Sequence, residues 1–451
     1  MKRRAIVIGA GSAGCAAAFE ASRLGFAVEL IDSAPVPGGG SFGRGALPAA
    51  ILRDCLRRYS SSPGADRPQR SSEALFREFV AVRGQVSRAH LAETRRNLES
   101  AGVRFVQGRA RFSAPDAVSF DAGRTLHASV VVIATGSRPR RPPSMPIDGD
   151  IVCDEESIWS LDRLPRSLVI VGAEVVGCEF ACLFAALGVQ VTLIERRRRL
   201  IRCLDRDLLE RLHGRLQELG IVVAIEEEIA AIDVVGGPPE RHATLRLASG
   251  RVEKCDRVLV LAGRKAASAE LGLEGVGIAT ATGGFPTVDE SGQTSQPGVY
   301  AIGDVVGYPF RIGTGLHQAR IAIRHAVGES PPLSDEPPIT IHTLPAIGVV
   351  GMIEEAVRRL DLPYGVGRAR LEATFAGQVE RRAPGLLKLI FQREEGRLLG
   401  VEVMGEGATE LIHIGAAWLQ GGGTLDQIAS SIPAQPSLAE AFRLAALDGL
   451  G

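Results

Sequence analysis

The chain has 451 residues, of which 45% are hydrophobic and 23% are charged, and its formal net charge at pH 7 is zero. This length is sufficient for two or three domains with substantial buried cores. Because a net charge of zero provides no electrostatic footprint for nucleic acid or for an anionic membrane, we expect neither as a partner.

The start of the chain and its cysteines predict a cytoplasmic protein. No run approaches the length of a membrane span, and the apolar run after the first basic residues is interrupted by glycine, unlike a signal peptide. The seven cysteines show no CxxC or other metal spacing, so we expect reduced thiols and no metal site. Cys178 and Cys182 share one face of a predicted helix, where we expect them to be small buried residues.

The segment from Arg4 to Asp32 has the pattern strand, glycine turn, helix, strand. In such a unit the glycines allow a tight turn, a close approach of the backbone to a pyrophosphate, and close packing of helix on strand. The helix N-terminus faces the phosphates, and the final acid, Asp32, can accept from ribose hydroxyls. We therefore predict a dinucleotide site rather than a ligand-free glycine turn. Its turn consists of Gly9, Ala10, Gly11, Ser12, Ala13 and Gly14.

The next hundred residues predict a loop, two helices and several short strands. A glycine-rich loop leads into a helix, a polar turn or insertion follows, and a buried strand ends at the sequence ATGS. In chain order, the segments are the loop and helix Pro35–Leu52, the polar segment 61–70, the helix Glu73–Ala101, the strands between Val103 and His127 with a turn at Gly123, and Val130–Pro139.

A second unit of the opening type begins at Leu168. Its glycine turn is GAEVVG, and Glu195 occupies the position of the strand-end acid. Two such units predict two bound dinucleotides. The predicted segments that follow are the helix Asp205–Leu219, a hairpin turning at 236–239, the strand Arg257–Leu261, the segment Gly298–Asp304, the linker Glu329–Pro338, and the helices Thr409–Gln420 and Ser437–Leu447.

The order of GAGSAG, ATGSRP, the second glycine turn, AGR and YAIGD resembles the flavoprotein pyridine nucleotide-disulfide oxidoreductases along the whole chain. The segments GAEVVGCEFA, GDVVGYP, YGVGRAR, ELIHIG and LAEAFRLAALDGL are most similar to the soluble pyridine nucleotide transhydrogenase branch. The resemblance implies an α/β fold with two Rossmann-like domains, for FAD and NAD(P), and an α+β C-terminal dimerisation domain. It implies a homodimer with an FAD domain at 1–150 and 269–330, an NAD(P) domain at 151–268 and a dimerisation domain at 335–451.

The resemblance also implies which residues hold the cofactors. A strand-end carboxylate at Asp304 is suited to the ribityl hydroxyls. The expected FAD residues are Gly9, Gly11, Ser12, Ala13, Gly14, Asp32, Gly40, Ser41, Thr135, Gly136, Gly303 and Asp304. The expected NAD(P) residues are Gly172, Gly177, Glu195 and Gly263.

Three departures from the family bear on the chemistry of a redox disulfide. The two family cysteines correspond to Ser41 and Ala46, which cannot form a disulfide or a thiolate. The family's C-terminal acid–base pair of histidine and glutamate corresponds to Gln435 and Glu440, and Gln435 cannot exchange a proton near neutral pH. The transhydrogenase branch usually lacks the second cysteine and this histidine, and passes hydride through flavin N5 alone.

A fourth departure removes a positive charge near the flavin. In the family a lysine at the position of Ala50 pairs with the acid at Glu179. Because the chain contains only four lysines, we expect no neighbouring lysine to substitute. The reduced anionic flavin then loses a stabilising charge.

A fifth departure lies in the second glycine turn, where Glu174 replaces the middle glycine. We expect its side chain to obstruct the pyrophosphate and its carboxylate to repel phosphate by about 1 to 4 kcal/mol in a wet site. Glu195 favours NAD over NADP, whereas one of the arginines Arg196–Arg199 is able to accept a 2′-phosphate. The alternative for these arginines is a solvated turn.

Four further residues have both a functional and a structural interpretation. Ser41 and Arg44 lie where chemistry on the flavin face is expected, and the alternative is that they only fill the loop. His317, in GLHQAR, is expected to touch FAD through its backbone rather than to act as a base. His413, in ELIHIG, is expected to pack or hydrogen-bond in the dimerisation domain.

Two functions remain open from the sequence. The first is an FAD-dependent NAD(P)H oxidoreductase, transhydrogenase-like or a diaphorase that passes electrons to a quinone or another nucleotide, so the expected partner is a small-molecule acceptor or a second nucleotide. The second is an FAD-binding protein with a decayed nicotinamide site, which serves as a scaffold or partner subunit or acts on another small substrate. Glu174, Ala46 and Ala50 favour the second, and Glu195 with the whole-chain pattern favours the first. The catalytic candidates are Ser41, Arg44, Glu179, Gln435 and Glu440.

Overall fold

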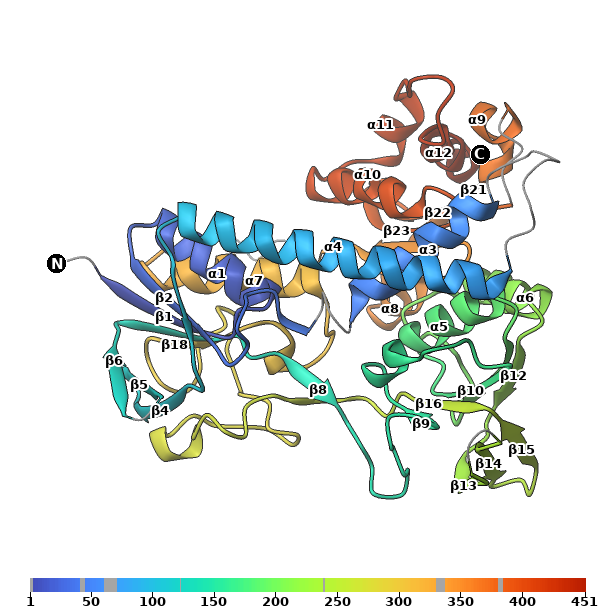
Figure 1. The fold of residues 1–451 in the computed structure, drawn as a ribbon. Coiled ribbons are helices and arrows are strands. Elements are labelled where there is room, and N and C mark those ends of the chain that lie inside the picture. Colours follow the sequence, from blue (N-terminus) through green and yellow to red (C-terminus); the bar gives the residue numbers. More distant parts are fainter. Residues whose placement is uncertain are drawn as a thin grey trace.

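The computed structural model of the chain describes residues 3–40, 45–60, 71–121, 123–237, 240–329, 337–379 and 384–451. The chain folds around three five-stranded sheets, of which two are parallel and one is antiparallel (Figure 1). Over the ranges just given, none of the helices has the length and apolar character needed to span a membrane.

The first sheet is parallel and joins strands that are distant in the sequence. Its order is β18-β7-β1-β2-β3, so β1 lies at its centre. Because the strands are parallel, the glycine turn after β1 and the residues after β7 meet at the same edge of the sheet. The strands are β1 (Arg4–Ile8), β2 (Ala27–Asp32), β3 (Arg104–Gln107), β7 (Val130–Ile133) and β18 (Val299–Ala301).

The helices α1 and α7 pack against each other over the first sheet. The buried face of α1 consists only of small residues, which lets α1 approach its neighbours closely. The long helix α4 runs from the first sheet toward the second (Figure 1). The helices of this part are α1 (Ser12–Arg23), α3 (Ala46–Ser60), α4 (Ser72–Ser100) and α7 (Ile312–Ala326).

The second sheet repeats the parallel arrangement within one continuous segment. Its order is β12-β11-β10-β16-β9, with β10 at its centre, as β1 is in the first sheet. Its elements are β9 (Val152–Cys153), η1 (Ser157–Ser160), β10 (Ser167–Val171), α5 (Val175–Ala186), β11 (Gln190–Glu195), α6 (Arg206–Glu218), β12 (Val222–Ile225) and β16 (Arg257–Val260).

Three smaller sheets are antiparallel. One accompanies each parallel sheet, and the third is a pair of strands, β8 with β17, where the chain passes between the two parallel sheets. The strands are β4 (Arg111–Ala114), β5 (Ala117–Phe120), β6 (Arg124–His127), β8 (Ser137–Pro139), β13 (Ile229–Val235), β14 (His242–Leu247), β15 (Val252–Cys255) and β17 (Arg264–Ala266).

The C-terminal part is an antiparallel sheet in the order β19-β20-β23-β22-β21, covered by helices α10 to α12 (Figure 1). Its elements are β19 (Ile339–Ile341), β20 (Ile347–Gly351), α8 (Glu354–Arg359), β21 (Tyr364–Arg370), η4 (Leu371–Ala373), α9 (Phe375–Val379), β22 (Leu386–Gln392), β23 (Leu398–Met404), α10 (Ala408–Gln420), α11 (Leu425–Ser430) and α12 (Glu440–Leu450). Two short 3-10 helices lie earlier in the chain, before α7. They are η2 (Glu274–Val276) and η3 (Gly303–Val306).

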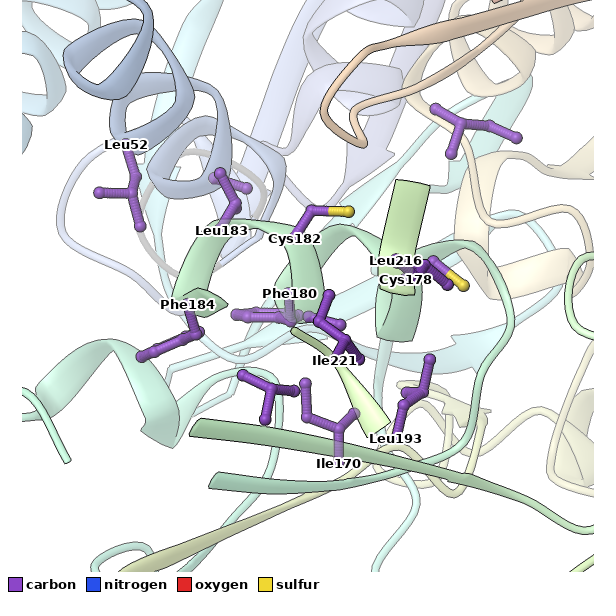
Figure 2. Packing of buried hydrophobic residues seen from close by; sticks show 14 of the residues in the cluster. Leu52, Ile170, Cys178, Phe180, Cys182, Leu183, Phe184, Leu193, Leu216 and Ile221 are labelled. Carbon is purple, nitrogen blue, oxygen red and sulfur yellow. The ribbon is translucent and has the colours of Figure 1, made fainter. Parts of the chain in front are cut away.

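The largest core cluster joins α3 and α4 to the second sheet. Figure 2 shows Cys178, Phe180, Cys182 and Phe184 of α5 in this cluster, together with Ile170 of β10 and Leu52 of α3. Neighbouring aromatic rings extend this cluster. The ring centroids of Phe180 and Trp159, for example, are 5.1 Å apart. Both cysteines are therefore buried packing residues, as predicted.

A buried charge cluster joins the second sheet to the C-terminal sheet. Lys388 of β22 is fully buried, and its Nζ lies 2.8 Å from a carboxylate oxygen of Asp205, just before α6. The same Nζ donates to Glu354 of α8 and lies 3.4 Å from Asp207 and 3.9 Å from Glu402. Because Lys388 is buried away from water, its charge depends on these carboxylates for stabilisation.

The elements predicted from the sequence are mostly present. The last helix is a partial exception, because α12 begins at Glu440 rather than at Ser437. The Ser437 hydroxyl accepts the N–H of Ala439 at 3.1 Å, which favours a turn over a helical start. Segment 61–70 and most of the predicted linker, 330–336, lie outside the described residues.

Candidate functional site

The first glycine turn has backbone contacts that only glycine allows. Gly9 has φ +105°, and a Cβ there would lie 2.4 Å from the carbonyl oxygen of Ala134. A Cβ on Gly14 would lie 1.8 Å from the carbonyl oxygen of Gly9. The turn after β1 thus packs closely against the residue that follows β7 and against the start of α1, as expected for a dinucleotide-binding turn.

The strand-end acid of this unit orders the turn. One oxygen of Asp32 accepts the N–H of Ala10 at 2.6 Å, and the other accepts the N–H of Ala34 at 2.8 Å. Each carboxylate oxygen retains a lone pair for another donor, such as a ribose hydroxyl. Asp32 is therefore fixed in place before any ligand binds.

Two buried hydroxyls at this edge of the sheet lack a partner. Among the described residues, neither Ser12 Oγ nor Thr135 Oγ1 has a hydrogen bond, although both atoms are buried. Buried polar atoms are almost always satisfied, so these two point to a polar ligand at the turn. Gly39 adds to the cradle, since a Cβ there would lie 2.6 Å from the Cα of Gly11. This arrangement fits the predicted FAD site.

The segment after β18 closes the same site. Gly303 has φ +72°, and a Cβ there would lie 2.9 Å from the Cβ of Ala13 in the first turn. The N–H of Gly303 donates to the side chain of Gln318 on α7 at 2.7 Å. The structure thus brings Gly303 and Asp304 to the first glycine turn, although these two residues are distant from that turn in the sequence.

Asp304 is held by residues that sequence reasoning did not select. Its carboxylate accepts the Ser137 hydroxyl at 3.0 Å, next to Gly136, which has φ +75°. Arg264 donates to the same hydroxyl at 2.7 Å and also to Glu155. Ser137 and Arg264 belong to the motifs ATGSRP and AGR. The motifs therefore draw attention to both residues, but the sequence does not show that they lie beside Asp304.

The second glycine turn repeats the first in detail. Gly172 has φ +109°, and a Cβ on Gly177 would lie 1.9 Å from the carbonyl oxygen of Gly172. Glu195 is buried; one oxygen accepts the N–H of Ala173 at 2.9 Å and the other accepts the N–H of Arg197 at 3.0 Å. These bonds match those of the acid in the first unit.

Glu174, in contrast, is not an isolated charge. Its Oε1 accepts Arg197 Nη1 at 2.5 Å and Arg202 Nε at 2.7 Å. The sequence-based estimate of phosphate repulsion treated the carboxylate as unpaired, whereas here two guanidinium groups face it. Gly263, the remaining predicted NAD(P) residue, is exposed immediately before β17 and has φ +89°.

Both parts of the chain match family models. Residues 3–326 match the pyridine nucleotide-disulphide oxidoreductase model, and residues 337–446 match the dimerisation domain of the same family. The chain belongs to the pyridine nucleotide-disulphide oxidoreductase family. Membership confirms the predicted fold class and FAD with NAD(P)H as cofactors, and it makes this chain an oxidoreductase. The dimerisation domain supports a homodimer.

Among relatives of this oxidoreductase are soluble pyridine nucleotide transhydrogenases. That of Mycobacterium bovis (strain BCG / Pasteur 1173P2) is 32% identical over 98% of this chain and 96% of its own length. That of Photorhabdus laumondii is 34% identical over 99% of this chain and 98% of its own length. Among solved structures, LpdA from Mycobacterium tuberculosis has a TM-score of 0.89 at 27% identity, with 98% of this chain and 99% of that chain covered.

A positively charged residue lies near Ala50 on the same helix. Arg53 lies one turn further along α3, and its positive charge acts on Glu179 of α5. Desolvation still raises the pKa of Glu179 to about 7, and its carboxylate accepts the N–H of His342 at 2.6 Å. The sequence-based expectation considered only lysines, whereas the residue that acts on Glu179 is an arginine three positions after Ala50 on the same helix.

His342 completes this group. Its ring nitrogen Nδ1 hydrogen-bonds with Arg53, and burial lowers its pKa to about 4, so the ring is neutral at pH 7. A neutral ring can accept from the guanidinium through one nitrogen. No motif in the sequence indicated His342, because its role arises from a contact between α3 and the residue after β19.

The two predicted C-terminal residues, Gln435 and Glu440, lie near the surface of one protomer. Gln435 is exposed in this protomer. Glu440 accepts the N–H of Phe375 at 2.8 Å and thus holds the start of α9. His413 is exposed on α10 in the protomer, and desolvation lowers the pKa of His317 on α7. Ser41 and Arg44 lie outside the described residues.

Proposed function

We propose that this chain is an FAD-dependent NAD(P)H oxidoreductase that works without a protein thiol and passes electrons to a small-molecule acceptor, either a second nucleotide or a quinone. The residues that would hold FAD are the turn Gly9–Gly14, Asp32, Thr135 and Asp304. When bound, FAD supplies hydride transfer between the nicotinamide and the acceptor. The residue ranges predicted for the three domains are also proposed, since the strands of each large sheet fall within them.

The observation that carries this proposal is the state of the cysteines. All seven are free, and burial raises the pKa of every one of them. The values reach about 12 for Cys15 and about 11 for Cys182. Since the thiolate is the reactive form, none of these residues is suited to disulfide exchange at neutral pH.

The C-terminal pair supports the same conclusion. A thiol that cycles between protonation states needs an acid–base partner, and Gln435 has no exchangeable proton near neutral pH. Glu440 accepts the N–H of Phe375 at the start of α9, and its expected histidine partner is replaced by Gln435. The names of the transhydrogenase relatives favour a second pyridine nucleotide as the acceptor.

The first test is an anaerobic titration of the purified holoprotein with NADH and then NADPH, followed through the visible absorption band of the flavin. We expect one or both nucleotides to bleach the band, and a nucleotide analogue or a quinone to restore it. A flavin that neither nucleotide bleaches contradicts the proposal and favours the FAD-binding scaffold.

A second test addresses the thiols directly. We expect iodoacetamide treatment of the folded holoprotein to leave NAD(P)H-dependent quinone reduction unchanged. We also expect no reduction of glutathione disulfide or lipoamide. Loss of quinone reduction on alkylation, with the fold and the flavin content retained, contradicts a mechanism without thiols.

A further inference from the structure

Glu174 differs from its counterpart in the first unit only in its side chain. It precedes α5 with φ −74° and ψ −172°, and Gly11 precedes α1 with φ −74° and ψ −176°. The backbone therefore follows the same path past the position where a nucleotide phosphate approaches. Whatever Glu174 changes in the site, it changes through its side chain.

The Glu174 carboxylate is turned toward arginines and not toward the helix. It accepts no hydrogen bond from the N–H groups at the start of α5, so it does not cap the helix. Instead one oxygen binds Arg197 and Arg202. The three side chains together carry a net charge of +1, because two guanidinium groups face one carboxylate. A phosphate approaching this group meets attraction as well as the single negative charge.

Arg197 lies between the two parts of the nucleotide site. Its Nε is 4.0 Å from an oxygen of Glu195, the acid at the ribose position, while its Nη1 reaches Glu174 at the helix start. Two other arginines of the segment Arg196–Arg199 pair with acids other than Glu174 and Glu195. Arg198 lies 3.3 Å from Glu226, and Arg199 lies 2.8 Å from Glu355.

We propose that Glu174 is an internal competitor for nucleotide phosphate. In the free protein its carboxylate holds Arg197, and a bound adenine nucleotide takes Arg197 over with one of its phosphates. This inference rests on the proposed use of NAD(P)H. The ligand group is either the diphosphate or the 2′-phosphate, because Arg197 borders both the helix start and the ribose acid. Glu174 thereby lowers nucleotide affinity and Arg197 raises it.

The test is a binding cycle on the holoprotein with two nucleotides that carry no nicotinamide. Calorimetric dissociation constants for ADP and 2′,5′-ADP are compared for the wild type, Glu174→Gln, and Glu174→Gln combined with Arg197→Met. Gln keeps the size of the side chain and removes its charge. Glu226→Gln is the matched control, since it removes the same charge from the neighbouring pair with Arg198.

We expect Glu174→Gln to tighten binding about tenfold, as removal of one opposing charge in a partly wet site implies. We expect Arg197→Met to reverse this gain in the Glu174→Gln background, and Glu226→Gln to have little effect. Both ligands carry phosphate at the 5′ position, ADP as a diphosphate and 2′,5′-ADP as a monophosphate, and only 2′,5′-ADP carries a 2′-phosphate. A gain for ADP, with or without a gain for 2′,5′-ADP, therefore identifies the 5′ phosphates, and a gain for 2′,5′-ADP alone identifies the 2′-phosphate.

Two results overturn the inference. The first is that Glu174→Gln binds both nucleotides with the same affinity as the wild type. Failure of every variant to bind either nucleotide counts as this result. The other is no loss on Arg197→Met in the Glu174→Gln background, since Arg197 then only neutralises Glu174. Flavin bleaching by NADH is measured separately. Bleaching without the expected cycle refutes only this inference, and the expected cycle without bleaching refutes only the proposed function.

Discussion

Replacement of Lys388 by methionine should destabilise the protein more than any other single lysine substitution. Methionine keeps most of the aliphatic stem, so the packing around β22 changes little. The charge is lost, however, and the carboxylates of Asp205, Asp207 and Glu354 then face one another without the buried cation. Removing one partner of a buried ion pair costs about 3 to 5 kcal/mol, and we expect the free energy of unfolding to fall by that amount.

The assay is urea unfolding of the holoprotein at pH 7.5, with Lys254→Met as the control. Lys254 is exposed on β15, so its replacement should change stability by no more than about 0.5 kcal/mol. Ion pairing with Lys388 lowers the pKa of Glu354, and the same charge contributes to the lowered pKa of Asp207. Their stabilisation is present in full above the ordinary carboxyl pKa and is lost as pH falls from there through the lowered pKa of each group. The gap between wild type and Lys388→Met should therefore shrink as pH falls below about 4. A gap below about 1 kcal/mol at pH 7.5 would refute this reasoning.

Three further predictions concern the cofactor site and its surroundings. Asp32→Ala removes the acceptor for two backbone N–H groups, and we expect the flavin-to-protein ratio after dialysis to drop sharply, whereas the exposed Asp116→Ala should retain FAD. The pKa of Glu179 is raised to about 7 from an ordinary value of 4.5, so its contribution to stability is complete below pH 4.5 and is lost as pH rises through 7. Glu179→Gln should thus be more stable than wild type at pH 8 and equal to it at pH 4.5 in thermal unfolding; a constant difference across this range would contradict the shift. Arg53→Met should lower stability at pH 8 by about 1 to 3 kcal/mol and by clearly less in the Glu179→Gln background, and equal losses in both backgrounds would show that Arg53 does not act on Glu179.

The local units of this fold were predictable because each is specified by consecutive residues. A strand, a glycine turn, a helix and a strand ending in an acid determine that Asp32 and Glu195 each lie beside their own turn. The hydrogen bonds from Ala10 to Asp32 and from Ala173 to Glu195 follow from that arrangement. The roles of these residues toward bound nucleotides remain predictions.

The pairings between units were not predictable in the same way. A sequence shows that Glu174 carries a charge but not that Arg202, 28 residues later, lies 2.7 Å from it. The same holds for Arg53, whose partner His342 is 289 residues away in the chain. Such contacts depend on how separate elements pack, and a pattern in either segment alone does not encode them. The sequence alone therefore predicts repulsion of phosphate by Glu174, and the pairing with Arg197 and Arg202 emerges only from the structure.

The way the first sheet is assembled has a consequence for synthesis on the ribosome. Strand β18 pairs with β7, yet the whole second sheet is translated between them. The second sheet is continuous in sequence, so all of its strands have been synthesised and can pair before β18 exists. At that stage the first sheet still presents β7 as an open edge. We therefore expect the inserted unit to acquire protease resistance earlier in translation than the unit that surrounds it. Nascent chains stopped before Val299 should expose that unfinished edge, where a chaperone or another nascent chain is able to pair.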